Sequence, residues 1–280
     1  MATARKSQRA GTRVESQPRS ARKTKRARPG WVPKYHGAWA MIIVPPILGV
    51  IEGGWQPVYV PLILTWWVGY FLFYAATMWL RSRMQRRYLQ PVLVYGAATG
   101  VLGLATWAAA PYLWRWVPLF VPLVAAAAWA AWKRKDRSLG AGLDTTLAAC
   151  VMLPVVWDAS TGGAAGLGAN PHIWAQAALL FGYFAGTVFY VKTNIRERHS
   201  TGYLICSWVW HIAWAAVAVA LAVGVCGVHI SVWHAVTWLV LVVRAVVVPM
   251  CGRRGHPLSV AAIGVGEIVF SVAIMVTLLV

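Results

Sequence analysis

The stretch YLICSWVWHIAWAAVAVALAVGV, residues 203–225, decides the fold class of this 280-residue chain. It contains no Asp, Glu, Lys or Arg, and a helix of this length covers the roughly 30 Å of hydrocarbon in a bilayer. Backbone groups in hydrocarbon must find their hydrogen-bond partners within the protein, which restricts spanning segments to helices and closed barrels. The stretch lacks the alternation of barrel strands, so we predict a transmembrane helix.

Eight further stretches of similar hydropathy predict an all-α, polytopic membrane bundle of nine helices. Of all residues, 59% are hydrophobic and only 12% are charged, a composition that excludes a soluble globular protein. Pro45 and Pro46 are expected to kink the first span. The predicted spans are residues 37–54, 58–80, 91–109, 112–132, 140–157, 172–191, 203–225, 228–250 and 257–279.

The segment before the first span has a different composition. Residues 1–33 alternate Arg and Lys with small and polar residues, so they offer no core that would offset the entropy of ordering. We therefore divide the chain into a disordered basic tail, 1–33, and a transmembrane domain, 34–280. We expect the tail to bind anionic membrane lipids and predict no nucleic-acid partner. An organellar transit peptide is the alternative interpretation of the tail.

Basic residues also recur in alternate connections between the spans, in segments 81–87, 133–137, 192–198 and 253–254. Together with the first 34 residues, these segments hold 24 of the 26 Lys and Arg residues. Short loops rich in Lys and Arg stay on the cytoplasmic side of a membrane. We therefore predict a protein of the cytoplasmic (inner) membrane with its N-terminus in the cytoplasm and its C-terminus outside.

The same connections supply candidate ligands for an anionic headgroup. Arg offers a planar fork of donors and Lys a mobile point charge, a combination that suits phosphate or carboxylate. If the sixth span continued as a helix beyond residue 191, Lys192, Arg196 and His199 would share one face. The competing interpretation is that these charges only anchor and orient the chain. The candidate ligand-binding residues are Lys34, His36, Arg83, Arg87, Lys133, Arg137, Lys192, Asn194, Arg196 and Arg198.

Ionisable residues also fall within the predicted spans. A charge at that depth costs at least about 2.5 kcal/mol, so such groups usually face the bundle interior and find a partner. Arg244 and Glu267 could form an internal pair, and His211 could transfer protons with them, although a structural role for all three is equally open. No metal site and no cofactor are predicted, because the four cysteines form no CxxC pair and no pattern with His at metal-binding spacing.

Several separated motifs resemble those of the YwiC-like family of bacterial multi-pass membrane proteins. They are PKYHGAWAMIIVPPILG at 33–49, DRSLGAG at 136–142, GTVFYVKTNIRERHS at 186–200 and SWVWH at 207–211. The resemblance extends from about Trp31 to the end of the chain. It implies a membrane location and brings no particular activity with it.

The layout also resembles, more distantly, that of the UbiA-type intramembrane prenyltransferases, and suggests two groups of four helices plus a ninth. Those enzymes hold Mg²⁺ and an isoprenoid diphosphate with Asp-rich motifs after their second and sixth helices. The corresponding segments here, 80–87 and 192–199, contain a single acid, Glu197. Because Mg²⁺ needs oxygen ligands, the resemblance does not extend to that chemistry.

Three functions are compatible with the sequence. The leading hypothesis is a membrane-embedded site for an amphiphile with an anionic head, such as an isoprenoid, a quinone precursor or a phospholipid, at the cytoplasmic leaflet. The first alternative is a secondary transporter, which the charges within the spans would suit. The second is an assembly or scaffold protein of the membrane. Whether the protein is an enzyme does not follow from the sequence.

Overall fold

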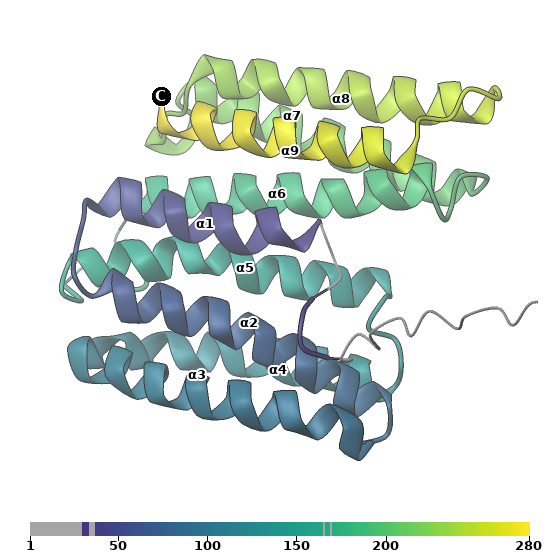
Figure 1. Ribbon diagram of the computed structural model, residues 1–280. Coiled ribbons are helices and arrows are strands. Elements are labelled where there is room, and N and C mark those ends of the chain that lie inside the picture. Colours follow the sequence, from purple (N-terminus) through teal and green to yellow (C-terminus); the bar gives the residue numbers. More distant parts are fainter. Residues whose placement is uncertain (1–29, 34–36, 165, 169) are drawn as a thin grey trace, which may run out of the picture.

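The computed structural model describes residues 30–33, 37–164, 166–168 and 170–280, and the described residues form a bundle of α-helices (Figure 1). Most of the basic tail and the candidate residues Lys34 and His36 lie outside the described residues. Three short 3₁₀ helices, η1 (Arg86–Tyr88), η2 (Pro111–Trp116) and η3 (Val225–Gly227), lie in connections. The α-helices are α1 (Ala38–Gly53), α2 (Tyr59–Arg81), α3 (Leu89–Ala109), α4 (Val117–Trp132), α5 (Leu139–Ser160), α6 (Pro171–Asn194), α7 (Thr201–Ala222), α8 (Val232–Arg253) and α9 (Val260–Leu279).

Eight of the described helical segments are long and apolar enough to cross a membrane, and α1 is a shorter apolar helix of 16 residues. The prediction of an all-α membrane bundle is thereby confirmed, and each predicted span corresponds to one helix. Helix α8 begins at Val232 and not near residue 228. Ser231 accounts for this shift, because its side chain accepts a hydrogen bond from the Trp233 backbone N–H and caps the helix.

Helices α5 and α6 form the centre of the bundle. They are the most buried of the membrane-crossing helices, and they pack against each other. Helix α1 lies along α5; α2, α3 and α4 lie on one side of this pair, and α7, α8 and α9 lie on the other (Figure 1). A core of fully buried side chains joins the central helices to α1, α8 and α9; it includes Leu48, Leu153, Phe184, Trp238 and Ile274.

The peripheral helices expose large apolar side chains. On α3, for example, Val101 and Leu104 are each about two-thirds exposed, and Trp107 is also exposed. Apolar surface of this extent is unfavourable in water but is solvated by lipid chains. Most residues of α2 are half-buried, whereas α6 is the most buried of the membrane-crossing helices.

Two helix-internal prolines leave backbone carbonyls without their usual partner, and a tryptophan from a neighbouring helix binds each of them. Pro46 has no N–H to donate to Ile42, four residues earlier, and the Trp66 indole of α2 donates to that carbonyl at 2.9 Å. Pro249 likewise frees the carbonyl of Ala245, to which the Trp208 indole of α7 donates at 3.0 Å. Neighbouring helices thus satisfy the polar groups that proline releases in hydrocarbon.

Candidate functional site

The basic connections lie at one end of the bundle, where α2, α4, α6 and α8 end; we call this the basic end. Both α2 and α4 finish there in the same backbone motif. The N–H groups of Arg83 and Met84 bond to the carbonyls of the last turn of α2, and those of Arg134 and Lys135 do the same for α4. Arg83 and Arg134 occupy the left-handed position of these motifs, with φ of 58° and 57°.

Direct contacts join the α2–α3 and α4–α5 connections. Arg81 forms an ion pair with Asp136 at 3.1 Å, and Arg134 Nε donates to the Arg81 carbonyl at 3.2 Å. Two depressions border these contacts. One, of about 400 Å³, is lined by Arg81, Arg134, Asp136 and Arg137, and the other, of about 210 Å³, by Arg83, Trp132, Lys133 and Arg134.

The structure thus gathers part of the predicted headgroup site. Arg83 and Lys133 line the smaller depression, and Arg137 lines the larger one. Lys192 lies beside them, because its Nζ donates to the Arg137 carbonyl at 3.4 Å. Arg87 instead lies over the ring of Tyr88. Arg81 and Arg134 were not among the residues predicted from the sequence, although both belong to the same basic segments.

The expected stripe of Lys192, Arg196 and His199 on one helical face is absent, because α6 ends at Asn194. Side chains satisfy the carbonyls of its last turns: Asn194 donates to Tyr190, and Arg198 donates to Asn194. Further helical turns are therefore not needed to pair these groups. Asn194 itself is buried, so it lies away from the exposed side chain of Arg196.

Within the membrane-spanning helices, Arg244 of α8 forms an ion pair with Glu267 of α9, at 2.6 Å between Nη1 and Oε1. Helix α6 contributes hydroxyl groups to the same carboxylate: Thr187 donates to Oε2 at 2.7 Å and Tyr183 at 3.3 Å. The rings of Tyr190 and Phe270 contact the guanidinium. We call these residues, with Arg244 and Glu267, the α6–α8–α9 polar cluster. The pairing considered from the sequence is present.

Two histidines are buried in the same half of the bundle. His211 Nδ1 lies 2.7 Å from the carbonyl of Ser207, in the preceding turn of α7. His234 Nε2 accepts a hydrogen bond from the Trp238 indole at 3.0 Å, so its Nδ1 carries the proton and donates to Thr277 at 2.9 Å. No role for His234 could be predicted from the sequence, since its partner Thr277 lies 43 residues away.

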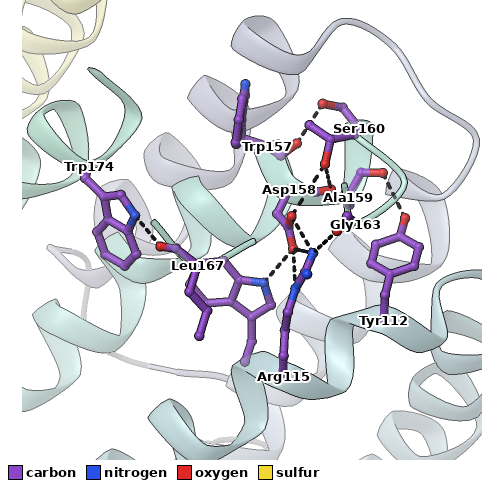
Figure 2. Close-up of polar contacts among 11 residues, drawn as sticks. Tyr112, Arg115, Trp157, Asp158, Ala159, Ser160, Gly163, Leu167 and Trp174 are labelled. Atoms are coloured by element: carbon purple, nitrogen blue, oxygen red, sulfur yellow. Dashed lines mark hydrogen bonds and ion pairs between the residues drawn. The ribbon is translucent and has the colours of Figure 1, made fainter. Parts of the chain in front are cut away.

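A third polar cluster lies at the opposite end of the bundle and was missed from the sequence (Figure 2). Asp158, in the last turn of α5, is fully buried and accepts hydrogen bonds from Arg115 and from the Trp116 indole. Arg115 also donates to the Gly163 carbonyl. A carboxylate at a helix C-terminus is electrostatically unfavourable, and Arg115 supplies the compensating cation. Because these donors and acceptors are paired with one another, we infer that the cluster stabilises the fold.

Fold and clusters together define a multi-pass helical membrane protein with cationic connections at one end and an ion pair among its spanning helices. The profile of the family described as YwiC-like protein matches residues 32–157. "Uncharacterized protein YwiC" of Bacillus subtilis (strain 168) is 31% identical over 190 residues, which are 65% of this chain and 74% of that protein. The chain therefore belongs to the YwiC-like family. No solved structure matches it, so the distant UbiA-like arrangement stays a prediction.

Proposed function

We propose that the protein binds the anionic headgroup of a membrane amphiphile at the basic end of its bundle. The observation that carries this proposal is the pair of adjoining depressions, which share Arg134 and are lined by five cationic side chains but one acid, Asp136. Asp136 is already paired with Arg81. The remaining cations carry a net positive charge that favours a phosphate or carboxylate group.

An amphiphile also needs apolar surface beside its headgroup site. Trp132 lines the smaller depression and is half exposed, and Trp129, one turn earlier on α4, is 60% exposed. Such side chains are typical of the boundary between headgroups and acyl chains. A ligand with its head in the depression would lay its chain along the exposed apolar surface of α4.

The same basic residues also favour one side of the membrane for the proposed site. Lys and Arg in short connections favour the cytoplasmic side, so we infer that the basic end faces the cytoplasm of the cell that makes the protein. The ligand would then come from the cytoplasmic leaflet, whose anionic lipids attract basic residues near the surface by about 1 kcal/mol each.

A comparison of two phospholipids tests the proposal. The full chain in nanodiscs would be titrated with phosphatidylglycerol and, separately, with zwitterionic phosphatidylcholine, and bound lipid would be counted by native mass spectrometry. We expect Arg83→Ala with Lys133→Ala to weaken phosphatidylglycerol binding roughly tenfold or more, as two charges at about 1 kcal/mol each imply. Phosphatidylcholine binding should change little.

Lys135→Ala with Arg254→Ala is the matched control. Both residues are exposed, both lie in connections at the basic end, and neither lines a described depression. The control removes the same charge, so it should leave phosphatidylglycerol binding close to that of the unmodified chain. Equal losses in the two double variants would show that only net charge matters and would refute a localised site.

A further inference from the structure

Arg244 has hydrogen-bonding capacity that the described chain does not use. Its side chain is only 9% exposed, and Nη1 is bound to Glu267. Its Nε and Nη2 are buried, and among the described residues neither has a hydrogen-bond partner. Buried donors in proteins are almost always paired, so two orphaned donors on one cation require an explanation.

The two free groups lie on the same edge of the guanidinium. Nε–H and Nη2–H point in parallel, and this is one of the edges with which arginine binds both oxygens of a carboxylate. The rings of Tyr190 and Phe270 lie 4.1 and 4.6 Å from Cζ and help to shield the group. The Nε/Nη2 edge therefore presents two parallel N–H donors that are shielded from solvent, and we call this edge the fork.

Glu267 is not available to fill this fork. Its Oε2 accepts hydrogen bonds from Thr187 and Tyr183 of α6, while its Oε1 binds Nη1 of Arg244. Turning the carboxylate onto the free edge would break the bonds to α6. The polar cluster thus holds Glu267 and leaves the Nε/Nη2 edge for another oxyanion.

We expect a ligand to reach the fork from the bilayer and not from the basic end. Arg244 lies nine residues before the end of α8, which is about 13 Å along the helix axis. Neither depression at the basic end is lined by it. The neighbouring residues Val240, Val243 and Val247 on α8 are exposed and apolar, as expected of a surface in contact with lipid chains.

We propose that the Nε/Nη2 edge of Arg244 binds the carboxylate of a membrane-dissolved amphiphile beside α8. This site is separate from the headgroup site at the basic end. It lies among the spanning helices, and its ligand is held by a bidentate pair and not by a cluster of surface charges.

Decanoate labelled with ¹³C at its carboxyl carbon is the probe, with decanol and acetate as comparison ligands. The full chain in detergent micelles should show saturable decanoate binding, seen as a shift of the ¹³C resonance. Decanol should compete weakly because it has no carboxylate, and acetate weakly because it does not partition into the micelle. Competition by decanol equal to that of decanoate would overturn the carboxylate assignment, and equal binding of acetate would overturn the bilayer source.

Two variants locate the binding at Arg244. Arg244→Lys keeps the charge but removes the fork, and we expect a loss of decanoate affinity of tenfold or more. Glu267→Gln keeps the fork and removes the neighbouring negative charge, so decanoate should bind at least as tightly as before. Unchanged binding in Arg244→Lys, or lost binding in a folded Glu267→Gln variant, would overturn the proposal.

A failure of Arg244→Lys to fold would still leave the Glu267→Gln comparison and the three-ligand comparison on the unmodified chain. Absence of saturable decanoate binding there overturns the site directly. The Arg83→Ala, Lys133→Ala variant should retain the decanoate binding that Arg244→Lys loses, because Arg83 and Lys133 are at the basic end. Loss of decanoate binding in that variant would assign the carboxylate to the depressions and not to Arg244.

Discussion

Arg115 and Asp158 bind each other over a separation of 43 residues, with Nη2 of the arginine 2.7 Å from both carboxylate oxygens. The contact fixes η2, between α3 and α4, to the last turn of α5. Asp158 is fully buried, and Arg115 is mostly buried. Removing one partner of such a pair leaves an uncompensated charge in a poorly solvated place.

We therefore expect Asp158→Asn to lower the free energy of unfolding by about 3 kcal/mol. Unfolding in mixed micelles, followed by circular dichroism during titration with SDS, measures the loss. Asp136→Asn is the control, because its partner Arg81 is partly exposed, and such pairs contribute about 1 kcal/mol or less. A loss at Asp158 no larger than that at Asp136 would contradict a structural role for the buried pair.

The proline and tryptophan pairs allow a double-mutant cycle. Trp66→Phe should cost about 1–3 kcal/mol of stability, because it leaves the buried carbonyl of Ile42 unpaired. In a Pro46→Ala background, the new alanine N–H can donate to that carbonyl, so the same Trp66→Phe change should cost about 1 kcal/mol less. The measurement is the free energy of unfolding of the four proteins, and additive effects would refute the coupling.

Close packing between α1 and α5 makes Gly49 sensitive to a single methyl group. A Cβ at this position would lie 2.7 Å from the Leu153 carbonyl and 2.8 Å from Cβ of Val156. Gly49→Ala should therefore destabilise the protein by about 1–3 kcal/mol in the same unfolding assay. Gly100→Ala is the control, since a Cβ there meets nothing within 4 Å and alanine favours the helix.

Cysteine labelling in intact cells tests the inferred orientation. In a background without native cysteines, Leu167→Cys in the α5–α6 connection should react with a membrane-impermeant maleimide added outside. Lys135→Cys, at the basic end, should react only after the membrane is permeabilised. Both native side chains are exposed, so accessibility to solvent does not distinguish them. The reverse pattern would place the basic end outside and remove the cytoplasmic leaflet from the proposed function.

The sequence predicted the helices well because hydrocarbon imposes one requirement on every spanning segment, the internal pairing of the backbone. It predicted side-chain partners less well. Asp158 was missed because the predicted span ended at residue 157, and Arg115 had no visible partner nearby in sequence. Arg244 and Glu267 could be considered a pair because few other charges lie within the spans.

The ends of helices were the least predictable feature of the candidate site. The stripe expected after residue 191 depended on a continuing α6, but Asn194 and Arg198 end the helix with their own hydrogen bonds. The left-handed backbone at Arg83 and Arg134 was equally hidden, since glycine more often takes such positions. Both features determine where the cationic side chains lie, so the depressions could not be predicted from residue spacing alone.

Arg134 borders both depressions at the basic end, so under the proposed function this shared residue would limit how many ligands the two depressions bind tightly. One guanidinium cannot form optimal hydrogen bonds with two anionic headgroups at the same time, and two bound anions repel each other across it. A second molecule should therefore bind more weakly than the first. The stoichiometry would rise in two steps, with negative cooperativity between them.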